Sequence, residues 1–410
     1  PTVYYQQSKD KENLEAAEKA MKTIRNTIGT PIGLWAGDEL IRFGDPIYGS
    51  ELCTAVEMMY SLENMLEITG NMQWADQLER IAYNALPTQI SDDAQARQYY
   101  QQVNQIAVVN DYHNFSTPHE GTDNLFGTLT GYPCCSSNLH QGWPKFVQHL
   151  WYATVDNGVA ALVYASSEVK MQVANNILVN IKEETYYPFD ETVSFSITYP
   201  DKKIKKATFP FHLRVPEWCK KPIVNLNGQT IKTDVTGERM IILNREWQQN
   251  DKITIEFPAT ISISHWFDGG AVVERGPLVY ALKLNEKWEK KTFDSPKDQE
   301  QYGEWYYQVT TDSPWNFAFK HNQIHKDGIE KNFIVEKKKN IATYPWTSAD
   351  APITIRSKAY RLPGWTENRN STGSIAYLVQ HHDSPEPKEY DIELIPYGCS
   401  TLRITLFPVR

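Results

Sequence analysis

The sequence is short of cysteine, of long apolar runs and of positive charge. Its 410 residues include five cysteines, too few and too odd a number for a disulfide framework. No apolar run approaches the ~20 residues that a membrane-spanning helix needs. The formal net charge of −9 argues against nucleic acid or an anionic membrane surface as the main partner. We therefore expect a protein that binds neither nucleic acid nor membrane.

Targeting and repeat signals are missing too. There is no signal peptide, and the first residue is Pro1 rather than Met, which fits a processed or truncated chain. The N-terminus therefore does not give the compartment; we expect a periplasmic or extracellular protein, with the cytoplasm as the alternative. Because internal repeats and low-complexity tracts are absent as well, a chain of this length should form two or three ordinary domains.

Aromatic residues, in contrast, are plentiful, with 12 Trp, 23 Tyr and 15 Phe. Large flat side chains stack on sugar rings, so this content favours carbohydrate as a partner. The alternative explanation for most of these residues is a sheet-rich core.

The first part of the sequence is typical of helices. Periodicity and good helix formers predict helices over 11–28, 53–70 and 74–85, the last one closed by Pro87. A fourth helix is expected to follow Asn138. Four helices cannot close a large helical barrel alone, so we expect part of that layer to be missing from this chain or supplied by another.

The rest of the sequence is typical of strands. After the turn signal at 156–158, short runs of β-branched and aromatic residues alternate with turn residues, a pattern that favours β-sandwiches. Polar segments around 287–304 and 320–340 are interpreted as long loops or interdomain connections. The sequence thus predicts a multidomain α + β protein, with a helical part at 1–156 and β-sandwich domains at 157–280 and 281–410.

Two adjacent cysteines, Cys134 and Cys135, precede residues that favour a helix start. The next three, 136–138, are good N-cap residues, and Pro144 is expected only in or near a first helical turn. Thiols at a helix N-terminus feel the positive end of the helix dipole, which favours the thiolate that attacks carbon and binds metal. The alternative is a pair of small buried residues at a helix start.

Glu51 and Cys53 stand two residues apart at the start of another predicted helix. With Cys134 and Cys135 they supply one carboxylate and three thiols, a plausible ligand set for tetrahedral zinc. The spacing is not that of a zinc finger, and the alternative is three uncoordinated thiols and a carboxylate that caps a helix. Two further cysteines are expected to be inert in strand-like surroundings: Cys219 and Cys399.

The segments Glu51-Leu52-Cys53 and Tyr132-Pro133-Cys134-Cys135-Ser136-Ser137-Asn138 carry a further signal. Together they resemble glycoside hydrolase family 127, the β-L-arabinofuranosidase family. The resemblance implies part of an (α/α)6 helical barrel followed by β-sandwich domains, and a retaining exo-hydrolase with a zinc-bound cysteine nucleophile. Four shorter segments support it: Val56–Ser61, Trp74–Asp76, Gly142–Pro144 and Asp156–Gly158.

The resemblance also assigns roles to single residues. It implies that Cys134 is the nucleophile, and that a Glu following a Gly upstream is the general acid. Glu39 is the preferred candidate for that acid and Asp38 the alternative, although the distance to Glu51 is shorter than is usual in the family. Leu52 stands where the family usually has Thr, which indicates a divergent subgroup and leaves the sugar open. The implied zinc ligands are Glu51, Cys53, Cys134 and Cys135.

Other side chains are candidates for contacts with a sugar or with the ligands, with loop, cap or core roles as the alternative for each. The polar candidates are His113, His119, Glu120, Asn138 and His140. Trp35 and Trp143 are candidates for a stacking wall, and Glu57, at i+4 from Cys53, for a partner of a ligand.

These observations favour an exo-acting glycoside hydrolase that releases terminal β-L-arabinofuranose, or a related pentose-like or acidic sugar of pectin, from plant glycans. The expected partner is an oligosaccharide or polysaccharide, and the expected cofactor is Zn²⁺. One alternative is a carbohydrate-binding protein whose zinc site is purely structural. Another is a zinc-dependent hydrolase that uses a metal-activated water, with inversion at the anomeric carbon.

Overall fold

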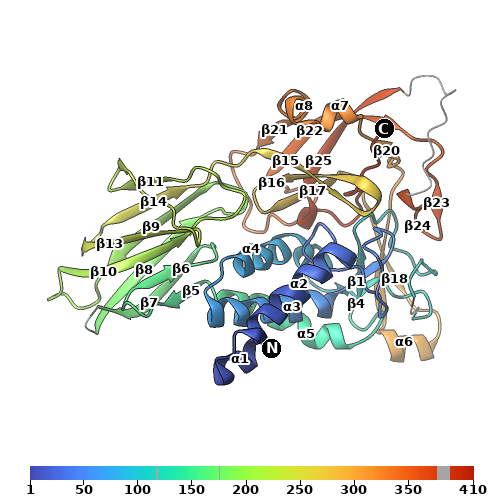
Figure 1. The fold of residues 1–410 in the computed structure, drawn as a ribbon. Coiled ribbons are helices and arrows are strands. Elements are labelled where there is room, and N and C mark those ends of the chain that lie inside the picture. Colours follow the sequence, from blue (N-terminus) through green and yellow to red (C-terminus); the bar gives the residue numbers. More distant parts are fainter. Residues whose placement is uncertain (117–118, 175, 376–387) are drawn as a thin grey trace. The chain divides into compact units, whose positions relative to one another are not determined.

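The computed structural model is a mixed helix-and-sheet protein (Figure 1). None of the helices in the described residues combines the length and hydropathy that crossing a bilayer requires. The structure describes residues 1–116, 119–174, 176–375 and 388–410.

The chain divides into two compact units. Unit 2 comprises Tyr60–Glu79 and Trp143–Thr260, and unit 1 comprises the remaining segments, Pro1–Met59, Arg80–Gly142 and Ile261–Arg410. These units reflect which segments pack most densely against one another, and they do not test the predicted domain boundaries. The three predicted domain ranges therefore stay a prediction.

Most of the predicted helices are present. α1 (Thr2–Ser8) precedes α2 (Glu12–Ile28), and α3 (Leu52–Thr69) ends at Gly70, whose φ of 63° is the left-handed conformation that a glycine cap adopts readily. α4 (Gln73–Arg80) continues into a π-helical turn, η1 (Ile81–Ala85), and then into η2 (Pro87–Gln89), which begins with the proline that ends the helix.

The helix expected after Asn138 begins earlier than predicted. α5 spans Cys134–Gln148, so both cysteines lie in its first turn. Pro144 lies inside the helix rather than near its start, which corrects the expectation from helix propensity. The missing proline N–H removes one intrahelical bond, to the carbonyl of His140, and the helix continues one turn beyond it.

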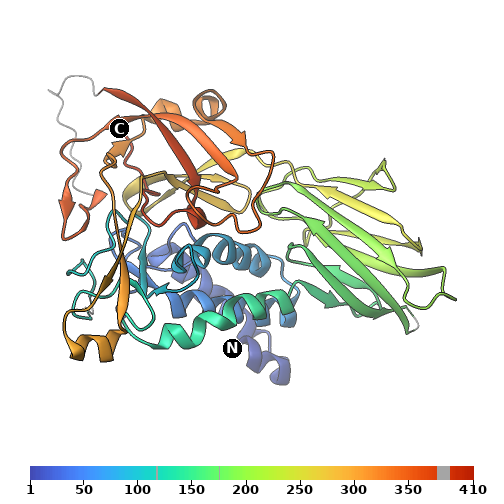
Figure 2. The same ribbon diagram turned by 180° about the vertical axis from the view of Figure 1, so that it is seen from behind.

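Two sheets of unit 2 pack face to face (Figure 2). Phe195 of the larger sheet contacts Trp151 and Phe211 of the smaller one, with ring centroids 5.8 and 5.2 Å apart. Alternate residues of the strands are buried, as expected when one face of each sheet forms the core. The smaller sheet has the order β13 (Met240–Gln248), β10 (Lys206–Arg214), β6 (Val159–Ala161), β5 (Trp151–Ala153), and the larger β12 (Gln229–Ile231), β11 (Ile223–Leu226), β14 (Lys252–Glu256), β9 (Thr192–Thr198), β8 (Ile177–Thr185), β7 (Ser167–Val173).

Unit 1 contains two larger sheets and two small two-stranded sheets. The seven-stranded sheet has the order β15 (Ile261–Trp266), β16 (Gly270–Arg275), β17 (Leu278–Leu282), β25 (Glu389–Pro396), β22 (Ile353–Arg361), β20 (Phe317–Ala318), with β21 (Ile334–Lys337) also paired to β22. The four-stranded sheet has the order β18 (Lys287–Thr292), β19 (Trp305–Thr310), β4 (Phe126–Gly127), β2 (Arg97–Gln98). The small pairs are β1 (Gly49–Glu51) with β3 (Tyr100–Gln102), and β23 (Glu367–Asn368) with β24 (Ser371–Thr372). The short 3₁₀ turns are η3 (Phe267–Gly269) and η5 (Tyr397–Cys399).

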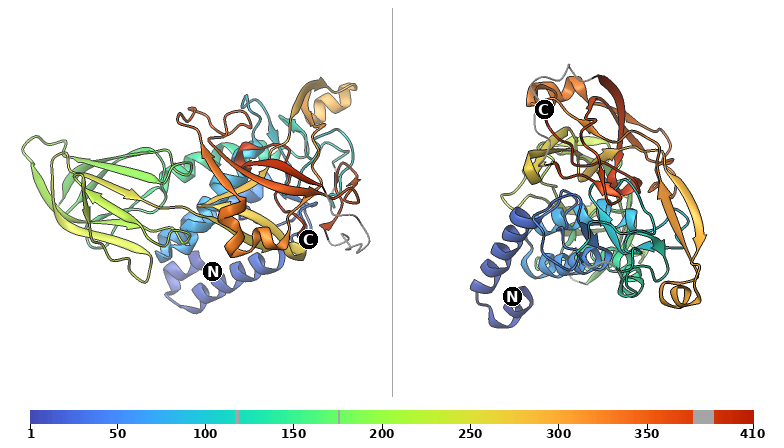
Figure 3. Two further views of the ribbon diagram at one scale, coloured as in Figure 1. Left: turned by 90° about the horizontal axis from the view of Figure 1, so that it is seen from above. Right: turned by 90° about the vertical axis from the view of Figure 1, so that its right-hand side faces the viewer.

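The two polar segments interpreted as loops are in fact largely regular, so that interpretation was wrong. Residues 287–304 form strand β18 and helix α6 (Pro296–Tyr302), which lies at the end of the β18–β19 ribbon (Figure 3). Residues 320–340 contain helices α7 (His321–Ile324) and α8 (Lys326–Asn332) and strand β21. The polar composition of these segments did not indicate regular structure. For the β18–β19 ribbon one reason is that β19 pairs with β4, a strand more than 150 residues earlier in the chain.

The described residues contain eight α-helices, three of which belong to these C-terminal segments. The α + β class is therefore confirmed, whereas the (α/α)6 barrel stays a prediction.

A buried polar network joins the segment Gln98–Gln105 to the C-terminal segment 397–406. Gln105 and Arg403 exchange two backbone hydrogen bonds, of 3.0 and 2.7 Å. Asn104, fully buried, accepts from the N–H groups of Thr405 and Leu406 at 2.9 and 3.0 Å and donates to the Leu406 carbonyl at 3.0 Å. The C-terminal segment thus fixes the part of the chain that carries Arg97 and Tyr99 in unit 1.

Replacing Asn104 by Ala should lower the free energy of unfolding by about 2–4 kcal/mol, because three buried backbone groups lose their partner. Urea unfolding followed by tryptophan fluorescence measures this loss. Asn64→Ala is the matched control: the Asn64 side chain bonds the carbonyl of Tyr60 one turn earlier on the helix surface, and its loss should stay within about 0.5 kcal/mol. Equal losses in the two variants would contradict the role given to the network.

Candidate functional site

The four predicted metal ligands lie together in unit 1. Their ligand atoms, one carboxylate oxygen and three sulfurs, all lie within 4.8 Å of one another. Cys53 Sγ is 3.3 Å from Cys134 Sγ and 3.2 Å from Cys135 Sγ, and the carboxylate oxygen Glu51 Oε1 is 3.4 Å from Cys134 Sγ. All three cysteines are free thiols, so no disulfide joins them.

Local structure brings these side chains together. Glu51 is the last residue of β1, where it pairs with Tyr100 of β3, and Cys53 lies in the first turn of α3, which follows at once. The Leu52 N–H donates to the carbonyl of Tyr99 at 3.0 Å, which fixes the point where strand becomes helix. The cluster therefore stands where the starts of α3 and α5 meet, with both helix dipoles favouring negative charge.

Arg97 holds the turn that leads into α5. Its buried guanidinium donates to Ser136 Oγ at 3.1 Å, to the Tyr132 carbonyl at 2.9 Å and to the Thr130 carbonyl. Burial lowers the pKa of Arg97, and the three nearby thiols oppose that shift. These contacts hold the backbone before the cysteine pair and the side chain of the residue that follows it.

The thiols strongly affect one another's protonation. Burial, with Cys53 and Glu51 nearby, raises the pKa of Cys134 to about 12. Burial and the hydrogen bond to Cys53 raise the pKa of Cys135 further, whereas the hydrogen bond from Cys135 lowers the pKa of Cys53, which Asn138 also contacts. Three thiols and a carboxylate in one place cannot all be anionic without a compensating cation.

The donor set fits a tetrahedral zinc ion. With Zn–S bonds of about 2.3 Å, sulfurs of one zinc site lie roughly 3.8 Å apart. The sulfur–sulfur distances here are 3.2, 3.3 and 4.0 Å, and Glu51 supplies the oxygen as a fourth ligand.

The side chains of the two candidate acids, Asp38 and Glu39, lie in different surroundings. Asp38 is fully buried, accepts from the Ser116 N–H at 2.7 Å and lies 3.8 Å from Arg42; burial raises its pKa. The Glu39 backbone is left-handed, at φ 71°, and its carboxylate accepts from the hydroxyl groups of Tyr99 at 2.6 Å and Tyr100 at 3.3 Å. Glu39 thus faces the aromatic pair beside the cluster, and Asp38 faces inward.

Tyr99 connects Glu39 to the cluster: its hydroxyl donates to Glu39, its carbonyl accepts from the Leu52 N–H, and the His119 ring packs edge-on against its ring. The negative charges of Glu39 and Glu51 each contribute to raising the pKa of Tyr99, after burial and the hydrogen bond to Glu39. The 2.7 Å hydrogen bond to Asp123 is the main cause that raises the pKa of His119, and the same two glutamates add to it. The contacts of Tyr99 thus place Glu39 on the side of the Glu/Cys cluster.

The packing around Tyr99 is tight. Gly131, at φ 66°, lies so close that a Cβ there would stand 2.5 Å from the Cβ of Tyr99. A side chain at this position would displace the tyrosine that holds Glu39.

The structure places the other sequence candidates in different roles. His113 is a core residue, bonded to the Asp111 carbonyl and to Asn124, and burial lowers its pKa. Glu120 accepts from the Tyr302 hydroxyl at 3.2 Å, and Glu57 and His140 are exposed. Of the polar candidates, His119 and Asn138 thus adjoin the cluster and its aromatic neighbours. The two tryptophan candidates are half-buried, Trp143 packing on Phe146 and Trp35 beside Gly37.

The sequence reasoning missed Arg97, Tyr99, Tyr100 and Asp123. The dense polar and aromatic run Arg97-Gln98-Tyr99-Tyr100 was a signal that could have marked this segment. Its importance depends on pairing with β1 and β4, which the local sequence does not show.

Two family profiles match the chain. Residues 1–148 match "Beta-L-arabinofuranosidase, GH127 catalytic domain", and residues 158–259 match "Beta-L-arabinofuranosidase, GH127 middle domain". A non-reducing end β-L-arabinofuranosidase of Bifidobacterium longum subsp. longum is 24% identical over 245 residues, which are 58% of this chain and 36% of that protein. The chain thus matches about a third of the length of this curated relative.

Solved structures show the same fold. A GH127 β-L-arabinofuranosidase from Geobacillus stearothermophilus T6 has a TM-score of 0.62 at 18% identity, over 89% of this chain and 51% of that one. A second GH127 β-arabinofuranosidase has a TM-score of 0.68 at 17% identity, over 100% of this chain and 58% of that one. With two GH127 profiles covering more than half of its residues, the chain belongs to glycoside hydrolase family 127.

Proposed function

We propose that this protein is a retaining, exo-acting glycoside hydrolase that releases terminal β-L-arabinofuranose from plant glycans. The observation that carries the proposal is the cluster of Glu51, Cys53, Cys134 and Cys135, whose ligand atoms lie within 4.8 Å of one another. Membership of family 127 and the likeness to two arabinofuranosidase structures support it. The helices of the first 148 residues are, on this proposal, part of an (α/α)6 barrel.

The proposed cofactor is zinc, held by Glu51 Oε1 and the sulfur atoms of Cys53, Cys134 and Cys135. Bound zinc would keep these sulfurs as thiolates at neutral pH. Without a metal, burial and crowding raise the pKa of Cys134 to about 12, which favours the neutral thiol. The nucleophile therefore requires the zinc to keep its sulfur as a thiolate.

Cys134 is the proposed nucleophile, and burial distinguishes it from its neighbour. Cys135 is fully buried, whereas Cys134, the first residue of α5, is partly exposed. In the first step the Cys134 sulfur forms a bond to the anomeric carbon while the bond from that carbon to the leaving oxygen breaks. Glu39 donates a proton to this oxygen, so the departing glycan leaves as a neutral alcohol.

The second step reverses these roles. Glu39, now a carboxylate, takes a proton from a water molecule, whose oxygen attacks the anomeric carbon and breaks the carbon–sulfur bond. Two displacements at one carbon leave the anomeric configuration retained. Tyr99 and Tyr100 hold the Glu39 carboxylate in place through both steps by donating to the same oxygen.

The proposed metal site can be tested by removing one ligand. Cys53→Ala should weaken zinc binding by more than the ~10–100-fold typical of losing an outer partner, because it removes a direct ligand. Titration with Co²⁺ reports the site independently of activity through sulfur-to-cobalt charge-transfer absorption. Cys219→Ala, which removes a buried thiol of unit 2, is the matched control and should leave this absorption unchanged. A wild-type protein with no thiolate–cobalt band would contradict the site.

The nucleophile can be tested by covalent labelling. An arabinofuranose with an anomeric epoxide or haloacetamide group should label Cys134, because the sugar places the electrophilic group of the probe beside the nucleophile. Peptide mass spectrometry locates the label. The Cys134→Ala variant should remain unlabelled and inactive, and retained hydrolysis in that variant would reject the assignment. An anomerically inverted product, seen by NMR, would favour direct attack by water. Failure of the wild type to hydrolyse any glycoside would favour a binding protein with a structural zinc site.

The acid can be tested through the leaving group. Glu39→Gln should slow hydrolysis of an arabinofuranosyl oligosaccharide by about 10²–10⁴-fold, and hydrolysis of a p-nitrophenyl arabinofuranoside much less, because nitrophenolate departs without a proton. Asp38→Asn is the matched comparison. Asp38 precedes Glu39 in the chain but is fully buried, so this variant should show no such dependence on the leaving group. If Asp38→Asn shows the dependence and Glu39→Gln does not, the two assignments are exchanged.

A further inference from the structure

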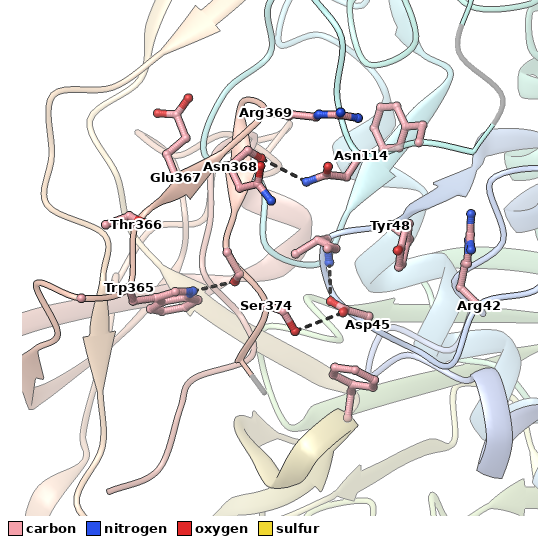
Figure 4. Close-up of a pocket in the computed structure, with 15 residues that line it drawn as sticks. Arg42, Asp45, Tyr48, Asn114, Trp365, Thr366, Glu367, Asn368, Arg369 and Ser374 are labelled. Carbon is pink, nitrogen blue, oxygen red and sulfur yellow. Dashed lines mark hydrogen bonds between the residues drawn. The ribbon is translucent and has the colours of Figure 1, made fainter. Parts of the chain in front are cut away.

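A pocket of about 840 Å³ lies in unit 1. Its volume is within the roughly 300–1,000 Å³ of small-molecule sites. Four parts of the chain that are far apart in sequence form its walls: residues 42–48, residues 114–115, Phe267, and residues 364–374 with the β23–β24 pair (Figure 4). No catalytic group assigned above lines it.

Hydrogen bonds hold these walls in place. Asn114 Nδ2 donates to the Asn368 carbonyl at 3.0 Å, and the Ser374 hydroxyl donates to Asp45 Oδ2 at 3.4 Å (Figure 4). The Trp365 indole N–H donates to the Gly373 carbonyl at 2.7 Å. The pocket is thus a preformed cavity with the polar groups fixed before a ligand arrives.

Charged and aromatic groups in the walls suit a polyhydroxylated ligand. Asp45 is 8% exposed and, within the part of the chain that the structure describes, forms no ion pair, so its oxygens can accept from ligand hydroxyl groups. Arg42, whose side chain is 33% exposed, lies over the ring of Tyr48 at 4.5 Å from its centroid. Arg42 and Arg369 are balanced by Asp45 and Glu367, which favours a neutral ligand over an anion.

The pocket adjoins the proposed acid through two of its wall residues. Arg42 Nε lies 3.8 Å from Asp38 Oδ1, next to Glu39 in the chain. The Phe115 ring lies 5.0 Å from the ring of Tyr100, whose hydroxyl donates to Glu39. In a retaining glycosidase the acid stands beside the oxygen of the departing glycan, so that glycan continues past the acid.

We propose that this pocket binds a neutral sugar residue of the glycan chain that departs from the cleaved bond. The inference rests on the proposed function, since it takes Glu39 as the group next to the leaving oxygen. It adds a place for the second part of the substrate, built from Tyr48, Asp45 and the 364–374 segment.

Two substrates of the same sugar test the proposal. One is a p-nitrophenyl β-L-arabinofuranoside, which has no sugar beyond the cleaved bond, and the other is a β-L-arabinofuranosyl arabinose oligosaccharide. Tyr48→Ala should lower the ratio of kcat/KM for the oligosaccharide to kcat/KM for the aryl substrate about 10-fold, a loss of ~1.4 kcal/mol. Tyr186→Ala, an exposed tyrosine of unit 2, is the matched control and should keep the wild-type ratio. An unchanged ratio for Tyr48→Ala overturns the proposal.

Binding without turnover separates this inference from the proposed function. An arabinose disaccharide should show saturation-transfer NMR signals with the wild type and weaker ones with Tyr48→Ala and with Asp45→Asn. A wild type that binds the disaccharide but hydrolyses neither substrate rejects the proposed function and keeps the sugar pocket. No binding to the wild type overturns the pocket, whatever the activity. Preference for a galacturonate disaccharide over the arabinose disaccharide overturns the neutral character assigned to the ligand.

Discussion

The candidate site depends on buried polar pairing between the segment Gln98–Gln105 and the C-terminal segment 397–406. Tyr397 donates to Gln101 Oε1 at 2.8 Å, and Arg403 Nε donates to the Gln102 carbonyl at 3.0 Å. A buried amide without a hydrogen-bond partner destabilises the folded state by far more free energy than a paired amide contributes to its stability. Such a network therefore permits one arrangement of the two segments. That arrangement positions Arg97 over the turn before α5 and Tyr99 against Glu39.

The site also gathers several acidic groups in a small volume. Three thiols and Glu51 meet at two helix starts, and Glu39 lies beyond Tyr99. Arg97 is the cation that the fold supplies, but it is committed to the backbone of the turn and the Ser136 hydroxyl rather than to the sulfurs. The three thiols and Glu51 therefore form a set of donors that could hold a metal ion, and they do not titrate independently of one another.

Much of this fold could be predicted where the signal is local. Helix α2 and helix α3 follow from periodicity, and Gly70 ends α3 as expected. The cysteine pair, Cys53 and Glu51 were singled out from their residue types as a plausible zinc ligand set, with uncoordinated thiols as the alternative, and the family resemblance then favoured the zinc site. Arg97 and the β18–β19 ribbon were not predicted, because each acquires its role from partners tens to hundreds of residues away. The start of α5 was misplaced because N-cap residues also occur inside a first turn.

The chain order of unit 1 has a consequence for biosynthesis. Its first two segments are separated from the third by the sandwich strands of unit 2. A ribosome that adds about 5–20 residues per second makes Gln105 roughly 15–60 s before it makes Leu406. Throughout that interval the Gln98–Gln105 segment lacks the partners in 397–406 that fix it, and this segment adjoins the strand and helix that carry Glu51 and Cys53. We expect the newly made chain to depend on a reducing environment until the segment 397–406 has been made, and the proposed metal to bind only after that point.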